Sequence, residues 1–119
     1  MVEALRAKTG SELWGFHFDI GHAYSNTPYS ETYGTAEWLE RTGPLVNGVH
    51  LHQFDRPRTA EEPLPEGHYA ILGRTAGHPS LLPLFAAWRR GAFRAPMILE
   101  IMRGEEGEPF TSLARLRAT

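Results

Sequence analysis

The sequence contains no cysteine. It therefore predicts neither a disulfide framework nor a thiolate metal cage, and imidazole and carboxylate groups are the ligands left for any metal ion. It also lacks an apolar run close to the roughly 20 residues that span a bilayer, and its N-terminus lacks the apolar core of a secretion signal. These absences favour a cytoplasmic protein that does not enter a membrane.

An excess of charge of either sign is also missing. The 119 residues include 12 Lys and Arg against 14 Asp and Glu, which gives a formal net charge of −2. Without a basic excess, attraction to a phosphate backbone is weak, so nucleic acid is not an expected partner. Hydrophobic residues make up 41% of the chain, an ordinary value, and the length suits a single domain over residues 1–119.

Helical and strand patterns alternate along the chain. The expected helices cover residues 2–8, 35–42, 81–90 and 109–117, and the expected strands cover residues 13–18, 49–54 and 96–101. Residues 23–34 are predicted to form a loop, and a long connection is expected over residues 55–79. The alternation predicts an α/β fold with parallel strands and helical crossovers. The nearly continuous apolar character of the third strand indicates burial on both of its faces.

Two of the expected helices carry an apolar stripe. In the third helix, Leu81, Leu84, Phe85 and Trp88 follow the helical spacing, which predicts that they face the core. In the last helix, the stripe consists of Phe110, Leu113 and Leu116.

Residues that can bind a metal ion stand near the end of each expected strand. Asp19 and His22 follow the first strand, His50 and His52 lie in the second, and Glu100 lies in the third. A glycine between Asp19 and His22 lets the chain turn sharply, which can bring the two side chains together. Parallel α/β folds build their sites at the carboxyl ends of the strands, so these side chains are expected to converge.

Each of these residues also has a structural interpretation. Asp19 can cap the turn after the first strand, and His50 can be an interior histidine held by a hydrogen bond. Glu100 can form a structural salt bridge to an arginine, since a buried carboxylate needs a partner. His17 and His52 are expected to pack rather than to bind a ligand.

Four segments of the chain resemble the final strands of the xylose-isomerase-like TIM barrels. This superfamily includes sugar and sugar phosphate isomerases and epimerases, and DNA-repair enzymes of the endonuclease IV type. The segments are Phe18-Asp19-Ile20-Gly21-His22, Val49-His50-Leu51-His52, His68 with Gly73, and Ile98-Leu99-Glu100-Ile101. The resemblance implies a partial (β/α)8 barrel made of about the last three βα units. Since a complete barrel takes about 250 residues, it also implies a missing N-terminal half, whose last strand would end in a further metal-binding glutamate.

The resemblance also implies a site and a reaction. Asp19, His50 and Glu100 would bind one divalent ion, for which Mn²⁺, Mg²⁺ or Co²⁺ suits the mixed ligand set and Zn²⁺ is compatible. The ion would hold two oxygens of a sugar or sugar phosphate and stabilise an ene-diolate. Glu100 would act as an acid or base, and His22 would contact the substrate and take part in catalysis.

The long connection supplies two further expected substrate-binding residues. Arg56 follows His50 by six residues, as an arginine does in some epimerases, and His68 belongs to the third matched segment. Arg56 also has the simpler interpretation of a solvated loop charge.

Two other functions are compatible with the sequence. In an endonuclease IV-like zinc-dependent phosphodiesterase, Glu66-Gly67-His68 would imitate the Asp-x-His pair of those enzymes, although the glutamate and the acidic net charge count against this. Alternatively, the chain is a non-catalytic fragment. Its open sheet edges would then need a second copy, another partner or the missing N-terminal half.

Overall fold

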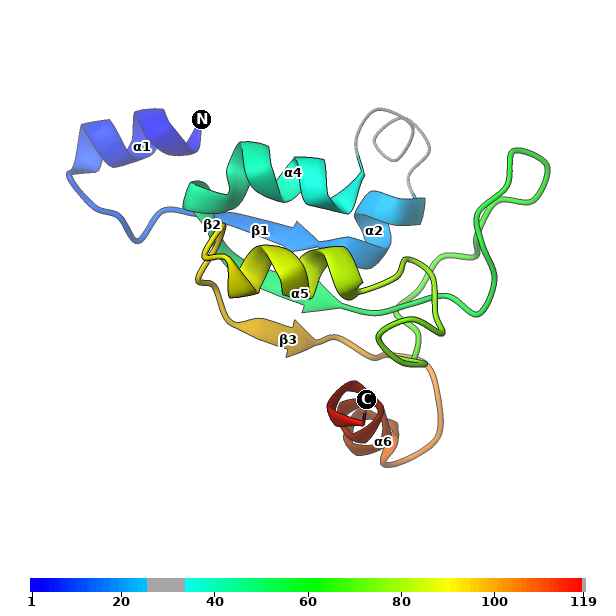
Figure 1. The fold of residues 1–119 in the computed structure, drawn as a ribbon. Helices are drawn as coiled ribbons and strands as arrows, with labels where there is room; N and C mark the ends of the chain where they lie inside the picture. The colour runs from blue at the N-terminus through cyan, green and yellow to red at the C-terminus, as the bar shows by residue number, and fades with distance from the viewer. Residues whose placement is uncertain (26–33, 119) are drawn as a thin grey trace.

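A computed structural model describes residues 1–25 and 34–118 of the chain. At its centre is a parallel sheet with the strand order β1-β2-β3, formed by Phe16–Asp19, Val46–Leu51 and Met97–Leu99. All three strands point the same way, and the segments that follow them gather at that end (Figure 1). The prediction of an α/β fold with parallel strands is confirmed. The described residues form a small open sheet, and they do not close into a barrel.

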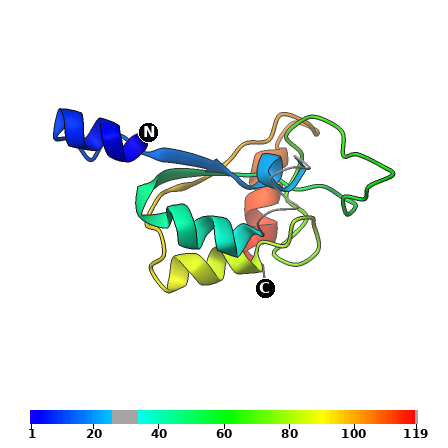
Figure 2. The ribbon, with the colours of Figure 1, turned by 90° about the horizontal axis from the view of Figure 1, so that it is seen from above.

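The helices are arranged unevenly around the sheet. They are α1 (Val2–Thr9), α2 (Ile20–Ser25), α4 (Thr35–Thr42), α5 (Leu82–Arg89) and α6 (Glu108–Arg117), and a short 3-10 helix, η1 (Gly43–Leu45), leads into β2. Helices α4 and α5 lie together on one face of the sheet, α6 lies beside β3, and α1 extends away from the body (Figures 1 and 2). Over residues 1–25 and 34–118, no helix has both the length and the apolar character needed to cross a membrane.

One face of the sheet forms the core. Phe18 and Val49 are paired in register and are buried with Leu51, against Leu39 of α4 and Leu84 of α5. These side chains bring together three segments that are distant in the sequence. Burial of such apolar side chains is the main driving force for folding.

The opposite face is open. Asp19 and His50 form the next register pair, so their side chains point away from the core. No helix of the described chain covers this face (Figure 2), and Ile98, the register partner of His50, is 46% exposed. The prediction that the third strand is buried on both faces is therefore wrong, because helices of the described chain cover one face alone.

The second strand begins earlier than the sequence predicted. Asn47 and Gly48 precede the expected strand but lie within β2. The Asn47 side chain donates a hydrogen bond to the carbonyl of Leu13, at 3.1 Å. Gly48 leaves room for the His17 ring, since a Cβ at residue 48 would lie 2.6 Å from its Cε1 atom. Contacts with Leu13 and with His17 of β1, which local propensity does not report, thus accompany the earlier start of β2.

The segment after β1 also differs from the prediction. Helix α2 occupies residues 20–25, so residues 23–25 are helical rather than part of a loop. The backbone N–H of His22 donates to Asp19 Oδ1 at 2.8 Å, which caps the first turn of this helix. The rest of the expected loop, residues 26–33, lies outside the described residues.

The apolar stripe predicted for α5 faces the core except at Trp88, since Phe85 also packs, partly buried, against the core. Leu84 and Ala87 are buried, together with Leu81 just before the helix, whereas Trp88 is 48% exposed.

In α6 a polar residue takes an inward position. Ser112 and Leu116 are buried, whereas Phe110, predicted to face the core, is exposed. The Ser112 hydroxyl accepts a hydrogen bond from the N–H of Ile71 and donates one to Glu108, both at 3.0 Å. Because both of these bonds are made, the hydroxyl can be buried at little cost.

Candidate metal centre

Two overlapping groups of metal-ligating side chains lie at the end of the sheet to which the strands point. The first consists of Asp19, His50 and Glu100, and the second of Asp19, His22, His52 and His68. Within each group, the nitrogen or oxygen ligand atoms all lie within 4.8 Å of one another. The structure thus brings together the three residues that the sequence predicted as metal ligands.

His50 is the centre of the first group. Its Nδ1 atom lies 2.5 Å from Glu100 Oε2 and 3.8 Å from Asp19 Oδ2. The backbone N–H of Glu100 bonds to the carbonyl of Leu51 at 3.2 Å, which fixes the glutamate just past β3 and beside His50. The three side chains are partly exposed, at 17% for Asp19, 28% for His50 and 31% for Glu100, so solvent or a ligand can reach them.

These distances fit a metal site after a small adjustment. Ligand atoms bound at about 2.1 Å to one ion lie roughly 3–4 Å from each other. The separation of His50 Nδ1 from Asp19 Oδ2 is in this range, whereas His50 Nδ1 and Glu100 Oε2 lie closer together than this and would have to move apart by about 1 Å. Two carboxylates beside one imidazole, open to solvent, are a donor set that divalent cations accept.

Asp19 links the two groups. Its Oδ1 atom accepts hydrogen bonds from the backbone N–H of His22 and from Nε2 of His52, at 2.8 Å and 3.0 Å. Burial alone would raise the pKa of Asp19, but the hydrogen bonds from His52 and from the His22 backbone outweigh it and lower this pKa to about 2. Asp19 is therefore an anion at neutral pH. It caps a helix with one oxygen and presents the other to the cluster, so the capping interpretation and the ligand interpretation are compatible.

His52 is buried, as expected for a packing residue, and it also contacts the site. Its side chain is fully buried and makes the hydrogen bond to Asp19. Its contact with the site could have been predicted from its position two residues after His50. Residues two apart in a strand lie on the same face, so both rings point toward Asp19. His17, by contrast, is exposed and belongs to neither group, although its ring lies edge-on to the His50 ring at 4.0 Å between centroids.

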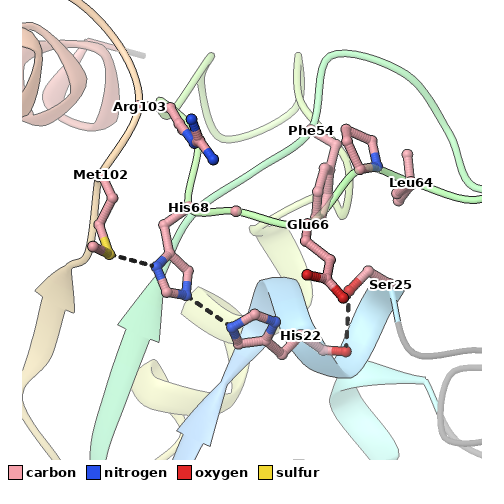
Figure 3. A pocket seen from close by; sticks show the side chains of 10 residues that line it. His22, Ser25, Phe54, Leu64, Glu66, His68, Met102 and Arg103 are labelled. Atoms are coloured by element: carbon pink, nitrogen blue, oxygen red, sulfur yellow. Dashed lines mark hydrogen bonds between the residues drawn. The ribbon is translucent and has the colours of Figure 1, made fainter.

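His22 and His68 meet across 46 residues of chain. Their Nε2 atoms are 2.8 Å apart, and His68 Nδ1 lies 3.2 Å from the sulfur of Met102 (Figure 3). The backbone N–H groups of Met102 and Arg103 donate to the carbonyl of His68 at 3.0 and 3.1 Å, which holds the loop after β3 against the long connection. A proton on Nδ1 of His68, facing the sulfur, would leave the Nε2 lone pair directed toward His22.

A cavity of about 750 Å³ opens beside this pair of histidines. Its lining includes His22, His68, Phe54, Met102 and Arg103, and Figure 3 shows the two rings side by side below Arg103. The volume lies within the range of small-molecule sites. The structure therefore places two of the expected substrate-contacting residues, His22 and His68, on the wall of a cavity that adjoins the ligand groups.

Arg56, the third expected substrate residue, is not brought to this cavity. Its guanidinium pairs with Glu62 at 3.0 Å and donates to the carbonyl of Pro63 at 3.1 Å, within the same loop. Arg103 lines the cavity instead. Sequence reasoning missed Arg103 because it lies in the irregular segment after β3, where no periodicity marks a residue as inward-facing.

Comparison of the chain with protein-family models, with curated proteins and with solved structures found no match in any of the three. The likeness to xylose-isomerase-like barrels therefore stays a hypothesis based on the residues quoted above.

Proposed function

We propose that this chain carries the metal site of a divalent-metal-dependent isomerase or epimerase of sugars or sugar phosphates. The observation that supports this most directly is the meeting of Asp19, His50 and Glu100, each at the end of a different strand. Two carboxylates and an imidazole suit Mn²⁺, Mg²⁺ or Co²⁺, and Zn²⁺ is compatible. Three protein ligands leave coordination positions open for oxygens of a substrate, as in catalytic sites.

The ion would supply electrophilic stabilisation where negative charge develops on the carbonyl and hydroxyl oxygens of the sugar. Asp19 and His50 would hold the ion. Glu100 would take a proton from the carbon next to the carbonyl to give an ene-diolate. For isomerisation it would return the proton to the neighbouring carbon on the same face, while a hydroxyl proton passes between the two oxygens; epimerisation would need a second acid that protonates the opposite face. His22 and His68, on the cavity wall, would contact substrate oxygens.

The open face of the sheet leaves space beside the proposed metal site. Asp19, His50 and Ile98 all point to it, and no described helix covers it. There is thus room for a further protein ligand, such as the glutamate that the family resemblance implies, from a partner chain or from a missing N-terminal half.

The proposal can be tested by hydrogen exchange. We expect the Mn²⁺-loaded protein, incubated in D₂O with a panel of aldoses, ketoses and their phosphates, to incorporate deuterium next to the carbonyl of at least one of them. Incorporation is followed by NMR and should stop when the metal is chelated. Metal binding without exchange in any sugar would contradict the sugar reaction but leave the metal site standing. Absence of metal binding would contradict both.

A second function is favoured by the second ligand group. Asp19, His22, His52 and His68 adjoin the first group and share a carboxylate with it, as expected if two cations bind side by side. This arrangement would suit a zinc-dependent phosphodiesterase that acts on DNA. Glu66, which would take the place of the aspartate in the Asp-x-His pair, lines the cavity with His68 but belongs to neither ligand group.

Binding to a duplex with an abasic site, measured across a salt series with Zn²⁺ present, separates the two functions. An isomerase with this acidic net charge should bind the duplex weakly and leave it intact. Affinity that falls steeply with salt, together with strand cleavage and more than one zinc per chain, would favour the phosphodiesterase.

A further inference from the structure

We infer that His52 is a positioning residue, whose hydrogen bond to Asp19 fixes which carboxylate oxygen is presented to a metal ion. The inference rests on the proposed metal site. It assigns His52 a role in orienting a ligand, although the side chain belongs to one of the two ligand groups.

The surroundings of His52 hold its ring in one place. The side chain is fully buried, and it lies against the backbone of Gly21, where a Cβ would come within 2.0 Å of the ring atom Cε1. The Phe54 ring packs against it edge-on, with 5.6 Å between centroids. A ring enclosed in this way keeps its Nε2 atom against Asp19 Oδ1, so we assign it to holding Asp19 rather than to binding metal.

The two nitrogens of His52 have different environments. Nε2 lies 3.0 Å from Asp19 Oδ1, whereas Nδ1 is buried and has no hydrogen-bond partner among the described residues. If the proton were on Nδ1, a buried N–H would lack an acceptor and Asp19 would lose the ring as a hydrogen-bond donor. If the proton is on Nε2, the bond to Asp19 is made and only a buried lone pair on Nδ1 is left without a partner, which costs less free energy. The proton is therefore assigned to Nε2, where it points at Asp19.

The bond from His52 gives the two oxygens of the Asp19 carboxylate different roles. Oδ1 receives both donors, the His52 ring and the His22 backbone N–H. Oδ2 faces the other potential ligands, at 3.8 Å from His50 Nδ1 and 3.9 Å from His22 Nε2. Rotation of the carboxylate would give up both hydrogen bonds, so Oδ2 is held toward the cluster before any ion arrives. Outer groups of this kind orient metal ligands in many sites.

Two substitutions at this position distinguish a donor from a packing residue. In His52→Gln, the side-chain amide nitrogen is as many bonds from the backbone as imidazole Nε2 and can reach Asp19. In His52→Asn, the amide nitrogen corresponds to Nδ1 and falls short. We expect His52→Asn to weaken binding of Co²⁺ about 10–100-fold and to shift the visible absorption of bound Co²⁺. His52→Gln should stay within about threefold of the wild-type affinity and keep the wild-type spectrum.

His78→Asn is the matched control, since it removes an imidazole that belongs to neither ligand group, and it should bind Co²⁺ as the wild type does. Thermal melting of all variants shows whether they fold. Equal affinity in the Asn and Gln variants, whether weakened or unchanged, would overturn the positioning role.

A second measurement needs neither a variant nor a metal. In the ¹⁵N-labelled metal-free protein, the His52 ring should carry its proton on Nε2, as reported by its nitrogen shifts. A proton on Nδ1 would overturn the inference, because Nε2 could then not donate to Asp19. If the wild type binds no Co²⁺, the proposed metal site fails, whereas the proton position still decides whether His52 holds Asp19.

Discussion

Asp19→Asn and Glu100→Gln are each expected to weaken binding of Mn²⁺ or Co²⁺ by more than about 100-fold, because each removes an anionic ligand, whereas loss of an outer group typically costs 10–100-fold. Both changes keep the size of the side chain. In the Asp19→Asn variant, the amide oxygen can still accept the hydrogen bonds from His52 and the His22 backbone, so the fold should persist. Metal content after dialysis, with calorimetric titration, gives the affinity.

Glu62→Gln is the control for these two variants. It removes a carboxylate that pairs with Arg56 in the long connection, outside both ligand groups. Its metal content should equal that of the wild type. The same metal stoichiometry in all three variants would count decisively against the site.

Gly21→Ala is expected to lower the free energy of unfolding by about 3 kcal/mol, the upper part of the usual range for overpacking. An added Cβ would lie 2.0 Å from Cε1 and 2.1 Å from Nε2 of His52. The ring is fully buried, so either the ring or the start of α2 must shift. A loss of this size is a large part of the stability of an ordinary domain. Urea unfolding of the metal-free protein measures it.

Gly34→Ala provides the matched comparison. No atom of residues 1–25 or 34–118 lies within 4 Å of a Cβ at that residue, and its backbone angles are ordinary extended ones, so the substitution should change stability by less than about 0.5 kcal/mol. His52→Ala in the Gly21→Ala background should recover part of the loss, because it removes the group that the new methyl meets. A Gly21→Ala protein as stable as the wild type would show that the His52 ring is not confined as described.

The convergence of the candidate ligands was easier to predict from the sequence than the contacts around them. Side chains alternate along a strand and parallel strands end at one edge, so Asp19, His50 and Glu100 could be placed together from their positions alone. The helical contact of His22 with Asp19 also follows from short-range geometry. Which oxygen of Asp19 is free, by contrast, depends on His52, whose orientation is set by contacts with residues in another segment.

The long connection was the least predictable part of the site. Residues 55–79 have no repeating pattern, so nothing local indicated that Arg56 pairs with Glu62 while His68 reaches His22. The open sheet face was missed for a related reason. The apolar residues of β3 indicate burial, but the pattern does not say whether the chain itself supplies the cover.

If an ion binds at the proposed site, the wide spacing of Asp19, His50 and Glu100 along the chain would couple its binding to folding. In the unfolded state these groups are far apart, so a cation would find its site only in the folded molecule. By mass action, each tenfold rise in free ion above the dissociation constant would then add about 1.4 kcal/mol to the free energy of unfolding. At the proposed site, supply of the ion would thereby raise the stability of the folded protein.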